Sequence, residues 1–200
     1  MIILVTPPKM KEQSEVPYYR IYKCFLAVIL LTFFSLSAAK GDETLFKKML
    51  EPGSSAPVNK LKDAMSKSEF IFPEKGKWNI VFYWSLFCHS CLSEIPAIQR
   101  HLPEDSDFNV YYVSLDSSRM EKGLENFGKK RRLTRPILME ELHEERYLTA
   151  DQWGVSATPA VFITNPEGKI AFSHAGPMDI DKFLADFEVM KNLGSEREQQ

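Results

Sequence analysis

Two cysteines, Cys88 and Cys91, lie three residues apart, and the 200-residue chain has one other cysteine. Apolar residues 80–84 precede them, and the apolar residues that follow recur at helical spacing, at Leu92, Ile95, Ile98 and Leu102. This pattern predicts a buried strand, a tight turn and a helix over residues 88–102 whose first turn carries both sulfur atoms. Because a helix N-terminus stabilises a thiolate, we expect Cys88 to be the more acidic and more exposed thiol. Cys91, one turn further on, is close enough to form a disulfide with it.

The spacing C-x-x-C-x-x-E-x-P, formed by Cys88, Cys91, Glu94 and Pro96, resembles the active site of exported thiol–disulfide oxidoreductases of the TlpA/ResA type. The resemblance covers residues 50–193 and implies an α/β thioredoxin-like fold, with a central mixed β-sheet flanked by helices. It also implies that Cys88 attacks a client disulfide and that Cys91 resolves the mixed disulfide. The reaction is thiol–disulfide exchange, which needs no bound cofactor and no metal ion.

Two further elements match this family. Thr158 and Pro159 stand directly before an apolar strand, where relatives carry a cis-proline that lies against the cysteines and positions the substrate backbone. The alternative is an ordinary proline at the start of a strand. Glu94 matches a buried acid near the cysteines, which would accept the Cys91 proton with a raised pKa. The alternative is an exposed first-turn glutamate favoured by the helix dipole.

Three features depart from the family pattern. Phe87 stands where relatives usually have tryptophan, and Phe82 stands where thioredoxin has a buried aspartate, which leaves Glu94 as the acid nearest the cysteines in the sequence. His89 and Ser90 occupy the two positions between the cysteines. A cationic His89 would lower the pKa of the neighbouring thiol and raise the reduction potential of the pair.

Residues 1–39 have the layout of a leader. Basic residues precede an apolar block over residues 25–39, and Ser-Ala-Ala at 37–39 resembles a cleavage site. We therefore expect a signal peptide, an exported protein in the periplasm or another extracytoplasmic compartment, and a mature chain that begins at Lys40. A retained membrane anchor formed by residues 25–39 and a buried globular helix are the alternatives, and translation could start at Met10 instead of Met1.

The remaining chain is predicted to hold a linker and opening loop at 40–60, one domain at 61–193 and a disordered tail at 194–200. Within the domain, residues 61–70 suggest a short helix followed by an edge strand, and residues 140–146 a charged surface segment. The other expected elements are strands at 79–84, 108–115, 160–163 and 169–172, and helices at 118–131, 147–155 and from Asp179 to Gly194.

The predicted function is reduction or exchange of disulfides in client proteins. A net charge of −2 gives no signal for nucleic-acid binding. The resemblance implies a membrane protein as electron donor and includes cytochrome c maturation among client pathways, but Ala160 replaces the glutamate that one cytochrome-maturation subgroup carries after the proline. A copper-binding module or metallochaperone is the alternative, since two thiolates suit Cu(I), although the loop at 156–159 has no histidine. A metal site at His143 and its glutamate neighbours is a further alternative.

Overall fold

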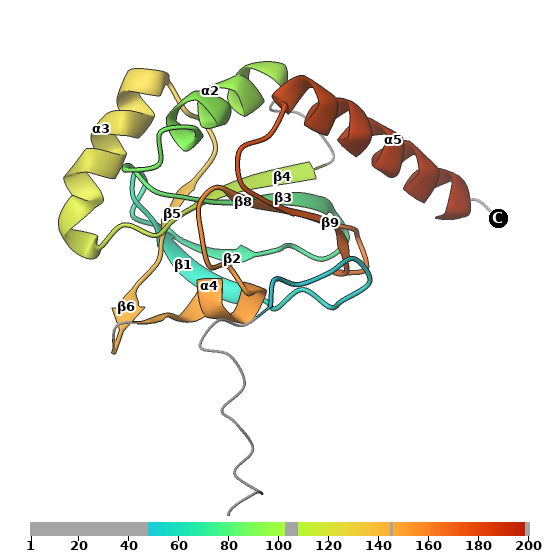
Figure 1. Ribbon diagram of the computed structural model, residues 1–200, viewed down its shortest axis with the longest axis horizontal. Coiled ribbons are helices and arrows are strands. Elements are labelled where there is room, and N and C mark those ends of the chain that lie inside the picture. Colours follow the sequence, from blue (N-terminus) through green and yellow to red (C-terminus); the bar gives the residue numbers. More distant parts are fainter. Residues whose placement is uncertain (1–47, 103–107, 145, 199–200) are drawn as a thin grey trace, which may run out of the picture. The chain divides into compact units, whose positions relative to one another are not determined.

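The computed structural model describes residues 48–102, 108–144 and 146–198. Seven strands form one mixed sheet in the order β2-β1-β5-β4-β3-β8-β9 (Figure 1). In the centre β3, β4 and β5 run parallel, and the neighbouring pairs on both sides are antiparallel. The strands are β1 (Asn59–Asp63), β2 (Glu69–Phe72), β3 (Trp78–Trp84), β4 (Phe108–Ser114), β5 (Ile137–Met139), β8 (Ala160–Thr164) and β9 (Ile170–Ala175).

Helices cover both faces of this sheet. Figure 1 shows α2, α3 and α5 on one side and the short α4 on the other. Their bounds are Cys91–His101 for α2, Glu121–Arg131 for α3, Leu148–Trp153 for α4 and Ile180–Glu198 for α5. A 3₁₀ turn, η2 (Ser118–Met120), leads into α3, and a small ribbon of β6 (Leu142–His143) and β7 (Arg146–Tyr147) leads into α4.

The strand β3 is buried on both faces, as the continuous apolar run predicts. Ile80, Phe82 and Trp84 pack with α2, α3 and α5 in one apolar cluster. Val81 and Tyr83 pack on the opposite face with Trp153 of α4. Because β3 is fixed between two packed layers, the residues that follow Trp84 leave the sheet at a defined point.

The short helix expected within 61–70 is wrong, because this segment belongs to the β1–β2 hairpin. The edge strand expected after it is confirmed, since β2 lies at the edge of the sheet. Alternate residues of β1 are buried, including Asn59 and Asp63. The Asp63 carboxylate accepts the backbone N–H of Ile137 at 2.8 Å, and Asn59 Oδ1 accepts the indole N–H of Trp153 at 2.7 Å. Polar residues therefore occupy the inward positions of this strand, where a hydropathy pattern does not reveal them.

The sheet also begins earlier than the predicted domain start at residue 61. β1 starts at Asn59, and the preceding loop is bonded to the fold. Leu50 N–H donates to Trp153 O at 3.1 Å, and Gly53 N–H donates to Ile170 O at 2.8 Å. The second half of the predicted linker and opening loop at 40–60 is thus hydrogen-bonded to the folded domain.

The last helix does not end at Gly194, and part of the predicted disordered tail is helical, since α5 continues to Glu198. A Cβ atom on Gly194 would lie 2.8 Å from Cζ2 of Trp78, closer than Cβ contacts in proteins. This glycine allows the helix to approach a rigid indole ring, and it does not mark a helix terminus as the sequence suggested.

The segment predicted as a charged surface at 140–146 contains one buried side chain, Glu140, which is 2 % exposed. Its Oε2 accepts the backbone N–H groups of Thr149 at 3.0 Å and Ala150 at 3.1 Å. The carboxylate thus bonds the first turn of α4, whose unpaired N–H groups need acceptors. The prediction of an exposed side chain was wrong for Glu140, because its hydrogen-bond donor Thr149 lies nine residues further along the chain.

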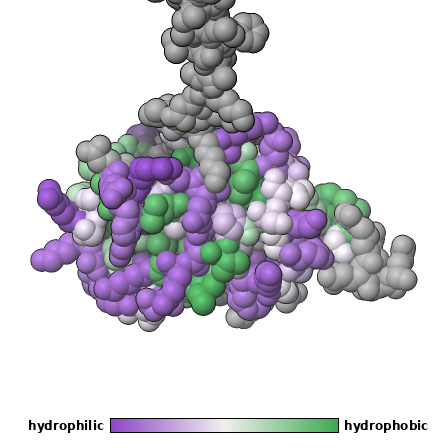
Figure 2. Space-filling view, turned by 90° about the horizontal axis from the view of Figure 1, so that it is seen from below, coloured by the Kyte–Doolittle hydropathy of each residue, from purple (hydrophilic) through white to green (hydrophobic). Residues whose placement is uncertain are grey.

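The surface on the α4 side is mixed in character. Seen from below, in Figure 2, hydrophilic residues dominate this face, with apolar residues between them. None of the helices in the described ranges has both the length and the apolar character that crossing a bilayer requires. The predicted leader at 1–39 lies outside the described residues.

Candidate active site

Cys88 and Cys91 form a disulfide, with an S–S distance of 2.02 Å and a Cα–Cα distance of 5.3 Å. Cys91 is completely buried, whereas Cys88 is partly exposed. The expectation that Cys88 is the more accessible of the two is confirmed. An incoming thiolate therefore meets the sulfur of Cys88 first.

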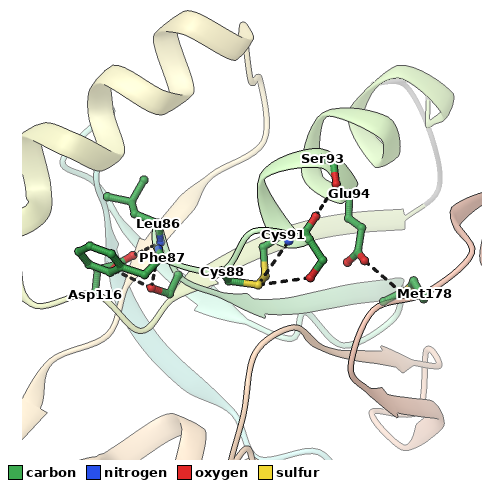
Figure 3. The surroundings of a disulfide bond; sticks show 10 residues. Leu86, Phe87, Cys88, Cys91, Ser93, Glu94, Asp116 and Met178 are labelled. Carbon is green, nitrogen blue, oxygen red and sulfur yellow. Dashed lines mark hydrogen bonds between the residues drawn. A yellow bond between two sulfur atoms is a disulfide. The ribbon is translucent and has the colours of Figure 1, made fainter.

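The helix that carries the pair starts later than predicted, at Cys91 instead of Cys88. Residues 88–90 form a turn, and Leu92 N–H donates to Cys88 O at 3.3 Å. The N–H of Cys91 points at the Cys88 sulfur, with N and Sγ 3.3 Å apart (Figure 3). Cys88 thus lies just before the helix and receives one of its unpaired N–H groups, which favours a thiolate at this position.

A buried carboxylate that the sequence reading missed, Asp116, holds the turn before Cys88. Asp116 is 4 % exposed and follows β4. Its Oδ2 accepts the N–H of Leu86 at 2.8 Å (Figure 3). Oδ2 also accepts the hydroxyl of Ser114 at 2.7 Å, and Oδ1 accepts the hydroxyl of Ser85 at 2.8 Å. A polar residue at the carboxyl end of a parallel strand is the sequence signal that could have indicated this position, because such strand ends gather at functional sites.

Glu94 is buried, with 6 % of its surface exposed, so the alternative of an exposed first-turn glutamate is wrong. Figure 3 shows its carboxylate beside Met178, whose N–H donates to Oε1 at 3.2 Å. Oε2 is buried and has no hydrogen-bond partner among the described residues. Burial raises the pKa of Glu94, while the Met178 N–H and the charge of His174 act in the opposite direction. One carboxylate oxygen thus lacks a donor and lies in a site that favours the protonated form.

The peptide bond between Thr158 and Pro159 is cis, in agreement with the cis-proline loop that the resemblance implied. Ala160, the next residue, pairs with Tyr83 near the end of β3. Because Cys88 follows β3, this register brings the start of β8 to the same end of the sheet as the cysteines. The Pro159 carbonyl accepts the N–H of Gly176 at 2.8 Å.

Aromatic residues surround the pair in two different ways. Phe87, next to Cys88, is 81 % exposed. Trp84 is completely buried and packs on Phe127, with ring centroids 4.9 Å apart. His89, between the cysteines, is exposed. In the sequence, the accessible Cys88 therefore lies between two exposed rings, the apolar ring of Phe87 and the imidazole of His89.

No group of three or more histidine, cysteine, aspartate or glutamate side chains with metal-binding geometry occurs in the part of the chain that the structure describes. His143 lies 3.5 Å from Glu141 and forms an exposed ion pair with it when protonated. Within the described residues, His143 and its glutamate neighbours therefore do not form such a group.

Comparison with known protein families identifies the domain. The model of the AhpC/TSA family matches residues 52–173, more than half of the chain. The chain belongs to the AhpC/TSA family. The match begins at Pro52 and therefore includes Gly53 of the opening loop, both cysteines, Glu94 and Pro159.

Several relatives of this AhpC/TSA chain are named thiol–disulfide oxidoreductases. The chain is 26 % identical to ResA of Bacillus subtilis over 132 residues, which cover 66 % of this chain and 72 % of ResA. It is 25 % identical to sporulation thiol-disulfide oxidoreductase A of the same organism over 135 residues, covering 66 % of this chain and 79 % of the relative. The resemblance to ResA-type proteins that the sequence motif indicated is confirmed.

A solved structure supports the same fold. The thioredoxin domain of a thiol–disulfide oxidoreductase from Bacteroides vulgatus superposes with a TM-score of 0.57 at 22 % identity, covering 69 % of this chain and 98 % of that domain. The thioredoxin-like fold, with a mixed sheet flanked by helices, is therefore confirmed for this AhpC/TSA member.

Proposed function

We propose that this protein is a thiol–disulfide oxidoreductase that acts on disulfides of client proteins outside the cytoplasm. One observation carries the proposal: a C-x-x-C disulfide has one accessible and one buried sulfur, at the sheet end where a cis-proline begins the adjacent strand. The similarity to ResA supports it, and the predicted leader supports the location. The clients are proteins with an exposed disulfide, and the protein needs no cofactor.

The reaction cycle starts when a dithiol donor protein reduces the Cys88–Cys91 disulfide by two electrons and is itself oxidised to a disulfide. The Cys88 thiolate then attacks one sulfur of the client disulfide. A Cys88–client bond forms, the client S–S bond breaks, and one client thiolate leaves and takes a proton from water. Cys91 next attacks Cys88, which restores the internal disulfide and releases the second client thiolate.

Glu94 is the proton acceptor for the second step in this proposal. Cys91 is buried, so its thiol has poor access to water. Glu94 lies three residues further along α2, on the same side of the helix, and its Oε2 has no donor among the described residues. The S–H proton of Cys91 moves to the carboxylate and leaves a thiolate that attacks Cys88. Solvent later removes the proton from Glu94.

Thr158, Pro159 and Phe87 position the client in this proposal. Pro159 cannot donate a backbone hydrogen bond, and its own carbonyl is already bonded to Gly176, so the client backbone pairs with Thr158. The exposed ring of Phe87 provides apolar contact for the segment around the client disulfide. His89 and Ser90 adjust the reduction potential of the Cys88–Cys91 couple in this proposal. Ser90 Oγ lies 3.6 Å from the Cys88 sulfur, and His89 is the next residue in the chain after Cys88.

Trapping of the mixed disulfide tests this function. Replacing the resolving thiol, Cys91→Ser, should leave client proteins covalently attached to Cys88, because the second step cannot occur. Cys88→Ser removes the attacking thiolate and should trap nothing. Non-reducing gels of extracts from cells that express each variant show the adducts, and treatment with dithiothreitol should release them. Adducts formed by the Cys88→Ser variant alone would reverse the two roles.

A further inference from the structure

One peptide group, between Pro177 and Met178, lies between the side chains of His174 and Glu94. Its N–H donates to Glu94 Oε1 at 3.2 Å, and its carbonyl oxygen lies 3.3 Å from His174 Nε2. A carbonyl oxygen accepts hydrogen bonds and cannot donate them, so His174 Nε2 carries the proton in this contact. The histidine and the carboxylate are therefore joined through one planar amide.

The loop that contains this amide is also bonded to the cis-proline. Gly176 N–H donates to Pro159 O at 2.8 Å, and Gly176 has a φ of +96°, where glycine is favoured. His174 belongs to β9 and pairs with Val161 of β8, so its backbone is held by the sheet. The loop that follows β9 thus donates the N–H of Gly176 to Pro159 and the N–H of Met178 to Glu94. Pro159 and Glu94 both belong to the proposed active site.

A hydrogen bond to the carbonyl of an amide polarises that amide and strengthens its N–H as a donor. The donor at Met178 therefore depends on the contact that His174 makes with Pro177. A protonated His174 also attracts the Glu94 carboxylate, and both effects oppose the rise in the pKa of Glu94 that burial causes. His174 thus favours the ionised form of the carboxylate, which is the form that accepts a proton.

Other ionisable groups on the elements packed against Glu94 have their own contacts. Asp179, at the start of α5, accepts the N–H of Lys182 at 3.1 Å. His101 and Asp181 face each other at 4.0 Å. Close to Glu94 in the sequence, Cys91 on α2 and Cys88 just before it are joined in the disulfide, and His89 between them is exposed.

We propose that His174 is a positioning residue for the exchange reaction, which orients the Pro177–Met178 amide so that its N–H holds the Glu94 carboxylate as the proton acceptor for Cys91. The catalytic part of this inference rests on the proposed function. His174 acts through Glu94 and does not touch the reacting sulfur atoms. Loss of His174 should reduce the ionised fraction of Glu94 at pH values around the midpoint of its titration and leave the Cys88–Cys91 pair intact.

The amide proton of Met178 gives a direct measurement, because its NMR chemical shift follows the ionisation of the carboxylate that it bonds. The shift is measured against pH in the reduced full domain for wild type, His174→Ala and His174→Gln. In His174→Ala the midpoint should move to higher pH, with the ionisation constant of Glu94 lowered about 2- to 10-fold, the usual effect of one hydrogen bond. Glutamine can donate to Pro177 O without a charge, so His174→Gln should recover part of the change.

At pH values below the Met178 midpoint, turnover of a disulfide-bonded test protein should fall by a similar factor in His174→Ala. The loss should disappear at high pH, where Cys91 loses its proton unaided. Two controls make the readout specific. Glu94→Gln should abolish the Met178 titration, which shows that the shift reports this carboxylate. His143→Ala removes an exposed histidine on β6 and should change neither the titration nor the turnover.

The outcomes separate the inference from the proposed function. An unchanged Met178 midpoint in His174→Ala, in a protein that exchanges disulfides, overturns the inference alone. A shifted midpoint in a protein that exchanges no disulfides overturns the proposed function and supports the link between His174 and Glu94. A shifted midpoint together with a parallel shift of the rate profile supports both.

Discussion

Glu94 combines properties that a proton acceptor beside a buried thiol requires. The side chain is buried, its pKa is raised by that burial, and one oxygen has no donor among the described residues. A structural carboxylate such as Asp63 contrasts with it, because both Asp63 oxygens accept hydrogen bonds from the backbone or from a hydroxyl. The oxygen that lacks a donor is therefore the feature that favours a chemical role for Glu94 over a structural one.

Replacing the carboxylate by its amide, Glu94→Gln, should slow reduction of a disulfide-bonded test protein about 10²–10⁴-fold near neutral pH, the usual contribution of general-base catalysis. The wild-type rate should rise as Glu94 ionises, at a pH above that of an ordinary glutamate because its pKa is raised. The loss in Glu94→Gln should shrink as pH approaches the ordinary thiol pKa of about 8.5. Rates measured over about pH 6–9 cover this window.

Two further measurements check this interpretation. Alkylation of Cys88 in the reduced protein should be nearly unchanged in Glu94→Gln, because the N–H of Cys91 still points at the Cys88 sulfur. Glu141→Gln changes an exposed glutamate and should have wild-type rates. Equal rates for Glu94→Gln and wild type at every pH would make Glu94 a structural residue.

The sequence alone indicated most of these side chains, and the reason is local spacing. Cys88, Cys91 and Glu94 lie within seven residues. Cys91 and Glu94 are about one helical turn apart on α2, and Cys88 lies just before it, so local spacing brings them together. Asp116 could not be found in this way, since its partners Ser85 and Leu86 are about 30 residues away and meet it only when β3 and β4 pair. The link between His174 and Glu94 could not be found in this way either, because it depends on the loop that follows β9.

At the scale of elements, the strand–turn–helix unit around the cysteines was predictable because its apolar pattern is continuous. The missed elements lack such a pattern. β1 buries Asn59 and Asp63, which are satisfied by distant hydrogen bonds, and β5 has three residues, too few for a period to show. Tertiary contacts, and not local propensity, define these strands.

Asp116 connects the ends of β3 and β4 at the active site, and Asp116→Asn tests that connection. The amide keeps one acceptor oxygen and turns an NH₂ donor toward the N–H of Leu86 or the hydroxyl of Ser85. The free energy of unfolding should fall by about 1–3 kcal/mol, the usual penalty for a buried group left without a partner. Because the turn held by Asp116 leads directly to Cys88, the rate of Cys88 alkylation in the reduced protein should also change.

Chemical denaturation and alkylation kinetics measure the two effects. Asp186→Asn is the matched control, since Asp186 is a partly exposed residue of α5 that pairs with Lys182 at 2.6 Å. That change should alter the free energy of unfolding by no more than about 0.5 kcal/mol. Unchanged stability and unchanged alkylation in Asp116→Asn would show that the turn before Cys88 is held without this carboxylate.

At the scale of the whole molecule, the site lies where three parts of the chain meet. The ends of β3 and β4 supply the turn that Asp116 holds, the start of β8 supplies Pro159, and the loop after β9 bonds both Pro159 and Glu94. The loop after β9 is separated from the cysteines by more than 80 residues, so the constellation exists only in the folded chain. Local folding of the C-x-x-C helix alone would not assemble it.

The chain before the sheet gives the last prediction. The opening loop is bonded to α4 and β9 through Leu50 and Gly53, which both follow Lys40 in the chain. A protein cut before Lys40 should therefore keep every contact of the described domain. We expect mass spectrometry of the protein purified from its native cells to find a mature chain that starts near Lys40, in the extracytoplasmic fraction.

The stability of the full chain and of a chain without residues 1–39 provides the physical check. A recombinant chain of residues 40–200 should have the same free energy of unfolding as the full chain, within about 0.5 kcal/mol, because the folded contacts are unchanged. It should also reduce the test protein at the same rate. An intact segment from Arg20 to Ala39 in a membrane fraction would instead establish an N-terminal anchor. A markedly less stable 40–200 chain would show that the leader packs on the domain, in agreement with the alternative of a buried globular helix.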